Sequence, residues 1–312
     1  MRDYSHKVRE LFEDQFREWK LARDNYDQLD RVIVRTVSFP GYDISVQFNP
    51  GRITSSAAKV DARSIEARPC FLCEKNRPAE QRGVPFGDDY IILINPFPIF
   101  RRHLTIVSNS HTPQRIGGSF ETMLRLAESL PEYVVFYNGP QCGASAPDHL
   151  HYQAGNRGFL PIESDIENPE LCHMVASSGE TEIWLWSGYG RGIMTLKGTD
   201  RSAMSVVFDR FRERFAMAQP DRPEPMLNIL AYKTDSQWTV HVIPRSVHRP
   251  ACYFAEDASR ILLSPASVDI GGVFITPREE DFRKITAEDI HAILGEVCLG
   301  ETELRNLVKD LI

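Results

Sequence analysis

Two histidines and a glutamine occupy alternate positions in one short segment, as His149, His151 and Gln153. In a β-strand alternate residues share a face, so a strand here would present these three polar side chains together and turn Leu150 and Tyr152 toward the core. The preceding stretch is rich in glycine and small residues, whose backbone N–H groups suit a phosphate. A lone His-x-His pattern is equally compatible with two surface histidines on an edge strand.

A CxxC pair, Cys70 and Cys73, follows Arg68 and Pro69. This spacing fits either zinc binding or redox chemistry and favours neither by itself. A thioredoxin-like pair would lie at the start of a helix after a strand, and the approach through a proline gives no such signal. Zinc needs about four ligands, usually Cys and His, so a metal site would require two more from elsewhere.

Hydrophobic periodicity predicts the elements that would position these groups. An amphipathic helix is expected over residues 8–19, and a hairpin over residues 32–37 and 44–48, turned at Pro40 and Gly41. The polar segment 49–69 is interpreted as a long connection that faces a ligand. Further strands are expected at residues 90–95, 104–107, 134–137, 182–186, 192–196, 227–232 and 239–244. Further helices are expected at residues 119–130, with Ser119 as the cap, and at 201–217, 287–298 and 301–311.

Two stretches in the two halves of the chain resemble each other. Residues 90–113 and 226–250 both run strand, turn, strand and then His-x-Pro, ending at His111 and His248. A duplicated α+β unit would produce this similarity, and so would chance.

The segment from Asn138 to Gln153 resembles the transferase branch of the histidine-triad superfamily, in which glutamine replaces the third histidine. That branch holds galactose-1-phosphate uridylyltransferases, diadenosine tetraphosphate phosphorylases and GDP-hexose phosphorylases. The resemblance implies an α+β, histidine-triad-like fold with two related halves, each an antiparallel sheet flanked by helices. Residues 1–175 would form the catalytic half with the zinc site, and residues 176–312 a second half that lacks the motif.

The same resemblance assigns roles at the site. His151 would attack the α-phosphorus of a nucleotide and form a covalent nucleotidyl-histidine, and Gln153 would contact its phosphate. Asn138 lies where the uridylyltransferases also carry an asparagine, and backbone amides around Gly143 and Ser145 would stabilise charge on the phosphoryl oxygens. A neutral imidazole is a good nucleophile, and a neutral amide can hydrogen-bond phosphate without supplying the strong acid that hydrolysis would need.

Zinc-bearing members of the superfamily combine a CxxC pair with two histidines. The matching positions here are Cys70, Cys73, His111 and His149. Four protein ligands leave no open position for water, so this zinc would be structural and would fix the segment that presents His151. Alternatively the metal is lost and the two cysteines are merely buried.

Two more segments concern the substrate. Residues 47–59 resemble the Q-x-N-x-G-R segment of GDP-hexose phosphorylases, which makes Arg52 and Lys59 candidate phosphate-binding cations; solvated loop charges are the other interpretation. The CxxC pair is better known from the uridylyltransferases, so the sequence mixes features of two groups. The expected activity is that of a nucleotide-sugar phosphorylase for GDP- or UDP-hexoses, or of a hexose-1-phosphate nucleotidylyltransferase. A dinucleoside polyphosphate phosphorylase and a non-catalytic nucleotide-binding protein are the alternatives.

Composition limits the partners. The 312 residues are 42% hydrophobic, enough for a large core, and the formal net charge of −7 argues against a broad surface for polymeric nucleic acid. Expected partners are therefore a nucleotide sugar or dinucleotide together with phosphate or a sugar phosphate. The charged N-terminus lacks an apolar signal core, and no apolar run approaches the roughly 20 residues that would cross a membrane. We expect a cytoplasmic protein with reduced cysteines; whether it forms a homodimer stays open.

Overall fold

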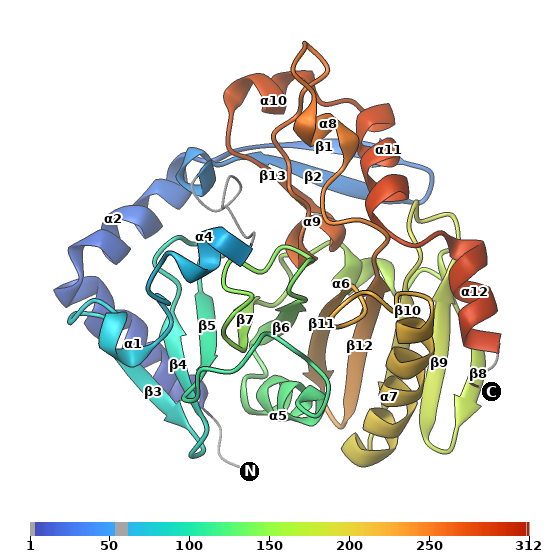
Figure 1. The fold of residues 1–312 in the computed structure, drawn as a ribbon, viewed down its shortest axis with the longest axis horizontal. Helices are drawn as coiled ribbons and strands as arrows, with labels where there is room; N and C mark the ends of the chain where they lie inside the picture. The colour runs from blue at the N-terminus through green and yellow to red at the C-terminus, as the bar shows by residue number, and fades with distance from the viewer. Residues whose placement is uncertain (1–3, 54–61, 310, 312) are drawn as a thin grey trace.

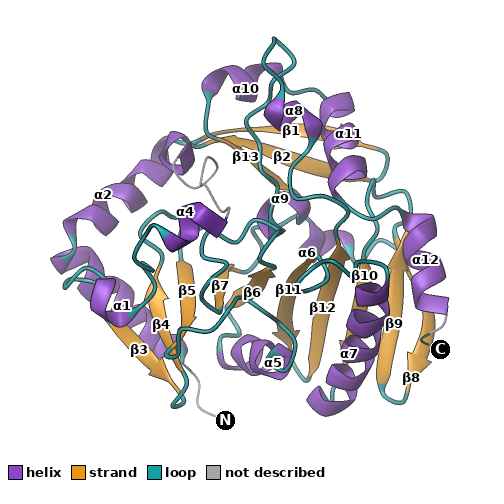
Figure 2. Ribbon diagram, in the orientation of Figure 1, coloured by secondary structure: helices purple, strands orange, loops and turns teal. Residues whose placement is uncertain are grey.

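The computed structural model describes residues 4–53, 62–309 and 311. In this part of the chain a ten-stranded sheet carries helices on its faces and a smaller, three-stranded sheet beside it (Figures 1 and 2). The strands are β1 (Ile33–Phe39), β2 (Tyr42–Phe48), β3 (Gly83–Phe86), β4 (Tyr90–Ile94), β5 (His103–Ser108), β6 (Tyr133–Asn138), β7 (His151–Asn156), β8 (Cys172–Ser178), β9 (Thr181–Trp186), β10 (Met194–Gly198), β11 (Leu227–Thr234), β12 (Gln237–Pro244) and β13 (Val273–Thr276). The helices are α1 (Ser5–Glu18), α2 (Lys20–Asp27), α4 (Ala62–Glu66), α5 (Phe120–Ser129), α6 (Ile162–Asp165), α7 (Arg201–Met217), α8 (Ala251–Phe254), α9 (Ser267–Ile270), α10 (Glu279–Lys284), α11 (Ala287–Val297) and α12 (Glu301–Lys309).

The large sheet consists of two halves that follow the same path. Its order is β3-β4-β5-β7-β6-β11-β12-β10-β9-β8. Each half therefore runs inward from an outer edge of the sheet, and in each half the last two strands lie in the reverse of their chain order. In each half a helix, α5 or α7, connects the third strand to the fourth. The α+β fold with antiparallel strands is thus confirmed. The two expected sheets are joined edge to edge into one, because β6 pairs with β11.

This topology corrects the alignment of the two halves. The sequence similarity matched β4 and β5 with β11 and β12, whereas the structural counterparts of β4 and β5 are β9 and β10. The second half also begins with β8, which a boundary after residue 175 would divide. The expected boundary after residue 175 thus falls within a strand, β8.

Both faces of the large sheet are buried. On one face, β-strand residues such as Val135 and Tyr137 pack against α1, α5, α7 and α12. On the other, Val134 and Phe136 belong to a second core that includes β2, β13 and α11. Alternate residues of β6 thus enter different cores, which explains its continuous apolar sequence, since a strand covered on both faces shows no polar alternation.

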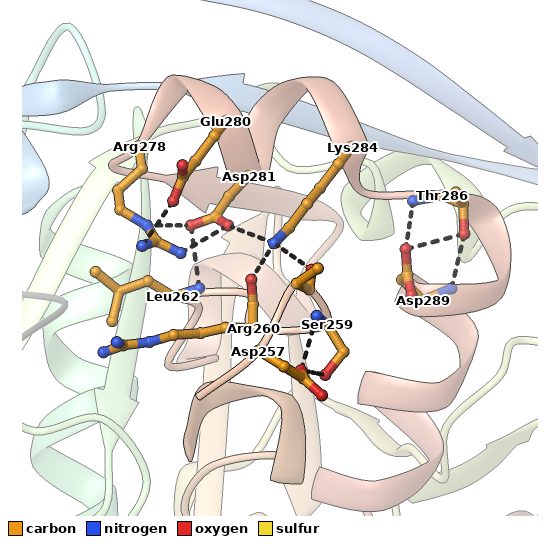
Figure 3. A network of polar contacts seen from close by, with 11 residues as sticks. Asp257, Ser259, Arg260, Leu262, Arg278, Glu280, Asp281, Lys284, Thr286 and Asp289 are labelled. Atoms are coloured by element: carbon orange, nitrogen blue, oxygen red, sulfur yellow. Dashed lines mark hydrogen bonds and ion pairs between the residues drawn. The ribbon is translucent and has the colours of Figure 1, made fainter. Parts of the chain in front are cut away.

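Hydrogen bonds to Asp281 hold a segment of the C-terminal region that lines the cavity described below. Asp281 is fully buried and accepts hydrogen bonds from Arg278 Nε and Nη2, at 2.7 and 2.9 Å, and from the backbone N–H of Leu262, at 3.1 Å (Figure 3). This bidentate arginine–carboxylate pair is a strong, directional contact. It fixes the chain just before Ser264 and Ala266, two residues that line the cavity described below.

Several expected elements differ from the observed ones. The strand expected to begin at His149 begins at His151, and the strand expected at residues 192–196 is Met194–Gly198. Ser119 precedes α5, but its hydroxyl donates to the carbonyls of Arg115 and Ile116 and caps no helix N–H. Sequence periodicity missed β3, β8 and β13: all three are edge strands of their sheets, and β3 and β13 have only four residues each, too few to show a period. None of the helices in the described ranges is long and apolar enough to cross a membrane.

Candidate active site

A cavity of about 550 Å³ lies at the ends of β6 and β7, bounded by the chain around α9 and β13. Its lining includes six of the predicted site residues: Arg52, Asn138, Gly143, Ser145, His151 and Gln153. One part of the wall is apolar, with Trp19, Leu72 and Leu93, whereas Arg52, Arg68 and Arg249 contribute cations. An apolar wall with a few polar and cationic groups is typical of a small-molecule site.

His151 is held in a single tautomer. Its Nδ1 lies 2.8 Å from the backbone carbonyl oxygen of His149. A carbonyl only accepts, so Nδ1 carries the hydrogen, and Nε2 keeps its lone pair. Burial lowers the pKa of His151 to about 4, which keeps the ring neutral near pH 7. A neutral imidazole with a free Nε2 is the form that acts as a nucleophile.

Gln114 holds the backbone at His151. Its Oε1 accepts the N–H of His151 at 2.8 Å, and its Nε2 donates to the carbonyls of Asn138 and His151, both at 2.9 Å. The pairing of β6 with β7 ends at Phe136 and Gln153. The Gln114 amide therefore replaces the missing backbone hydrogen bonds where the two strands separate, next to His151.

Gln153 lines the cavity two residues farther along β7. Its Oε1 lies 3.0 Å from His103 Nε2 and 3.4 Å from Asn95 Nδ2. Its Nε2 donates to no described protein group and is thus available to a ligand.

The Asn138 side chain is oriented like that of Gln153, with its amide oxygen bound to the protein. Its Oδ1 accepts from Asn228 Nδ2 at 2.8 Å and from the backbone N–H and hydroxyl of Ser267 at 2.9 and 2.7 Å. Asn228 is itself fixed by Arg245, whose Nη1 donates to Asn228 Oδ1 at 2.7 Å. With its oxygen fully used, Asn138 offers its amide N–H groups to the cavity. Arg245 itself is fully buried and acts through Asn228 rather than on a ligand.

The loop before His151 approaches α9 closely. Gly143 has φ +94°, and a Cβ built there would lie 2.6 Å from the Cβ of Ala266. Only glycine combines this left-handed conformation with such a close contact. The carbonyl of Ser145 accepts a hydrogen bond from Arg68 Nη2 at 3.3 Å, which ties the loop to the segment before the CxxC pair.

Arg52 follows the short turn at Pro50. Its Nη1 donates to the carbonyl of Phe97 at 2.6 Å, so part of the guanidinium is committed to the protein. Desolvation lowers the pKa of Arg52 to about 10, partly offset by Asp269, and the group stays charged near pH 7. Lys59, the other predicted cation, lies outside the described residues.

Cys70, Cys73, His111 and His149 come together. Their ligand atoms all lie within 4.8 Å of one another. Cys70 Sγ and Cys73 Sγ are 3.3 and 3.6 Å from His149 Nδ1, and Cys73 Sγ is 3.2 Å from His111 Nδ1. Tetrahedral zinc, with bonds of roughly 2.0–2.3 Å, separates its ligands by about 3.5 Å. The group therefore fits one metal ion.

The surroundings of these four residues fit a metal as well. His149 Nε2 lies 2.8 Å from the carbonyl oxygen of Ser108, so the hydrogen sits on Nε2 and Nδ1 is free to coordinate. Asp148 lies 3.9 Å from His111 Nε2 and also pairs with Arg68 at 3.0 Å. Metal-binding histidines commonly give their second N–H to a carbonyl or a carboxylate.

His149 thus does not share the cavity face of His151. It precedes β7, turns toward the cysteines and does not line the cavity. The strand alternation predicted one face for His149, His151 and Gln153; only the last two are in the strand.

Sequence reasoning missed three residues whose side chains contact the predicted site residues. Gln114 stands in a turn after Pro113, and Asn95 and His103 flank the Pro96–Pro98 break. Their roles depend on contacts over 37, 58 and 50 residues. An unusual polar residue beside a predicted apolar strand is the only local signal.

Two family models match the chain in separate parts. A domain of unknown function, DUF4922, matches residues 11–156, and a GDPGP1-like C-terminal domain matches residues 220–312. The first match includes the cysteines, both histidines of the motif and Gln153.

Sequence relatives point to the same branch. Galactose-1-phosphate uridylyltransferase of Lactococcus lactis subsp. cremoris (strain SK11) is 26% identical over 153 residues, 48% of this chain and 29% of the relative. The enzyme of that name from Halalkalibacterium halodurans is 25% identical over 157 residues, 45% of this chain and 30% of the relative. The match therefore spans less than a third of these relatives' length.

A solved structure covers almost the whole fold. Yeast Ap4A phosphorylase Apa2 superposes with a TM-score of 0.62 over 90% of this chain and 97% of that one, at 17% identity. The shared fold and the sequence relatives agree with the motif. The family matches, the sequence relatives and the shared fold together bear out the predicted resemblance to the transferase branch of the histidine-triad superfamily.

In the second half the position equivalent to Gln153 is packed among aromatic side chains. His241 is opposite Thr195 in the second half, as Gln153 is opposite Thr105 in the first. Trp186 donates to Thr195 at 2.8 Å, and the rings of Trp186 and Tyr232 both lie 5.8 Å from His241. Aromatic side chains therefore fill the space that the first half leaves open.

Proposed function

We propose that this protein is a nucleotidyltransferase that works through a covalent nucleotide on His151. The observation that supports it is the His149 carbonyl, which holds Nδ1–H and leaves Nε2 of a neutral imidazole at the cavity. Nε2 would attack the α-phosphorus of a nucleotide donor, and the bond to the departing phosphate oxygen would break. A phosphate oxygen of the acceptor would then attack the same phosphorus, and the P–N bond would break and restore the imidazole.

Donor groups around the cavity would stabilise the phosphoryl oxygens. We assign this role to the Gln153 and Asn138 amides, to backbone amides around Gly143 and Ser145, and to Arg52. Lys59, which lies outside the described residues, is assigned the same role from the sequence alone. Because the departing and attacking groups are phosphates, the reaction needs no strong acid, which suits a site whose polar groups at the nucleophile are amides.

We further propose that Cys70, Cys73, His111 and His149 bind a structural zinc. Their spacing and the second contacts of both histidines support it. The metal would fix His149, whose carbonyl orients His151. Its contribution is to position the nucleophile, and the four protein ligands leave no place for a reacting water.

The substrate we favour is a GDP- or UDP-hexose, cleaved by phosphate or exchanged with a hexose 1-phosphate. The relatives named galactose-1-phosphate uridylyltransferase and the GDPGP1-like C-terminal match support this choice. Cleavage of a dinucleoside polyphosphate is a second candidate, because the fold superposes on Ap4A phosphorylase along most of both chains.

Intact-protein mass spectrometry tests this proposal. The protein is incubated with UDP-glucose, GDP-glucose or diadenosine tetraphosphate, without an acceptor. We expect one donor to add a single nucleoside monophosphate, whose mass identifies the base, and added phosphate or hexose 1-phosphate to remove it. His151→Ala should form no adduct, whereas His173→Ala, a matched change on β8, should form as much as the wild type. Equal adduct in His151→Ala would reject the proposal.

A further inference from the structure

Resting on the proposed function, we propose that His103 and Asn95 are positioning residues that lock the Gln153 side chain with its NH₂ group toward the phosphoryl site. In this arrangement Gln153 is a donor only. It can donate hydrogen bonds to phosphoryl oxygens but cannot accept a hydrogen bond from an attacking water or hydroxyl.

The tautomer of His103 follows from its backbone contact. The N–H of Ile99 donates to His103 Nδ1 at 3.1 Å. Nδ1 is therefore the acceptor nitrogen, and the hydrogen of the neutral ring is on Nε2. Nε2 lies 3.0 Å from Gln153 Oε1, so this contact is N–H to oxygen. His103 is fully buried, and burial lowers its pKa to about 3, so the ring is neutral in working conditions.

Asn95 supplies a second donor, oriented in the same way. The N–H of Phe97 donates to Asn95 Oδ1 at 2.9 Å, which directs Nδ2 to the opposite side. Nδ2 then donates to Thr105 Oγ1 at 3.2 Å and, more weakly, to Gln153 Oε1 at 3.4 Å. The backbone N–H groups of Phe97 and Ile99 thus determine that Oε1 of Gln153 faces the protein and Nε2 faces the cavity.

The opposite orientation of Gln153 is unfavourable. A rotated amide would place its NH₂ against the N–H of His103 and the NH₂ of Asn95, donor against donor. A buried donor without an acceptor gives up its hydrogen bonds to water and gains none in return, so this orientation is destabilised. The structure instead leaves Nε2 of Gln153 at the cavity.

The loop that fixes both residues is itself held. The carbonyl of Pro96 accepts from Asn25 at 2.7 Å, and the carbonyl of Phe97 accepts from Arg52 at 2.6 Å. The His103 ring packs against Phe100 and Phe136, with centroids 5.3 and 5.9 Å away. Phe100 in turn leaves no room for a side chain at Gly155, where a Cβ would lie 2.3 Å from the ring. The donors are therefore set before any ligand binds.

Matched substitutions separate orientation from packing. In His103→Gln the new amide reaches the position of the original Nε2 and can still donate to Gln153. In His103→Asn the shorter side chain ends near the position of the original Nδ1 and cannot donate to Gln153. In Asn95→Asp an oxygen faces Gln153 Oε1, and the repulsion favours rotation of the glutamine. Asn109→Asp, whose side chain donates to the carbonyl of Asp88 on the surface, is the control.

The readouts are the rate of adduct formation at saturating donor (UDP-glucose, GDP-glucose or diadenosine tetraphosphate, whichever reacts), the donor concentration at half-maximal rate, the zinc content and the melting temperature. We expect His103→Asn and Asn95→Asp to slow adduct formation about tenfold to a hundredfold, less than the hundredfold to thousandfold loss on removing a transition-state donor, because Gln153 is misplaced and not absent. Zinc content should be unchanged. His103→Gln should stay within about threefold of the wild type, and Asn109→Asp should match it. A His103→Asn protein as fast as the wild type, or a His103→Gln protein as slow as His103→Asn, would overturn the inference.

The tautomer is measured without any substrate. In ¹⁵N-histidine NMR spectra, the signals that His103→Asn removes should be those of a neutral ring protonated at Nε2. A ring protonated at Nδ1 would refute the orientation, whether or not an adduct forms. A wild-type protein that forms no adduct would refute the proposed function, and the tautomer would still decide how Gln153 is held.

Discussion

Replacing Gln114 with methionine should destabilise the protein at the end of β7 that carries His151. The two side chains have similar volumes, so the change removes hydrogen bonds with little change in packing. Gln114 is 1% exposed, and its amide makes three hydrogen bonds of 2.8–2.9 Å to the backbone of Asn138 and His151. Methionine leaves one N–H and two carbonyls unpaired inside the protein.

The cost follows from these three groups. A typical intramolecular hydrogen bond contributes about 0.5–1.5 kcal/mol net, and an unpaired buried group costs about 1–3 kcal/mol. Partial relaxation and entry of water reduce the sum, so we expect a loss of about 2–4 kcal/mol in the free energy of unfolding. The rate of adduct formation should fall as well, because the His151 backbone is no longer fixed.

Urea denaturation of the zinc-loaded protein measures this loss. Gln141→Met is the matched control: Gln141 is only partly buried and accepts one hydrogen bond from the exposed Arg222. It should change the free energy of unfolding by less than about 0.5 kcal/mol. If Gln114→Met is no less stable than Gln141→Met and reacts at the wild-type rate, Gln114 does not support the site as described.

Three further predictions test other parts of the structure. Purified protein should contain about one zinc per chain; Cys70→Ser and Cys73→Ser should each lower metal content and melting temperature, whereas Cys252→Ser should change neither, and full zinc in the first two would exclude the assignment. Gly143→Ala should lower the free energy of unfolding more than Gly158→Ala, because both glycines have positive φ but only the Cβ at 143 would meet another atom within 4 Å. Equal losses in urea denaturation would show that the loop around Gly143 shifts to accommodate the new Cβ. Burial lowers the pKa of the fully buried His241 to about 3, so below about pH 6.5 the unfolded state binds a proton that the folded state does not bind. The contribution of this residue to the free energy of unfolding is therefore complete above about pH 6.5 and should fall by about 2 kcal/mol between pH 7 and pH 5. His241→Asn should remove that part of the pH dependence, and an unchanged slope would contradict it.

Local pattern was enough for most of the large elements. The helix at Arg201–Met217 and the strands β4, β6, β11 and β12 were predicted within two residues, since long periodic or fully apolar segments leave few alternatives. The grouping of Cys70, Cys73, His111 and His149 was anticipated through the resemblance and not through geometry. Spacing alone left zinc and redox chemistry equally open.

What could not be predicted depends on pairing between distant segments. Nothing local indicates that β6 meets β11, which turns two expected sheets into one. Likewise, the end of β6–β7 pairing at Gln153 depends on Gln114, which lies in neither strand. The misplaced start of β7 and the separate direction of His149 both result from this break.

The location of the bound nucleotide tests the central claim most directly. The protein is reacted with the effective donor, digested at neutral to alkaline pH, which spares the acid-labile P–N bond, and sequenced by mass spectrometry. We predict one nucleoside monophosphate on His151 and none on His103, His149 or His248. A nucleotide on any other residue, or turnover of the donor with no covalent species at all, would contradict this account.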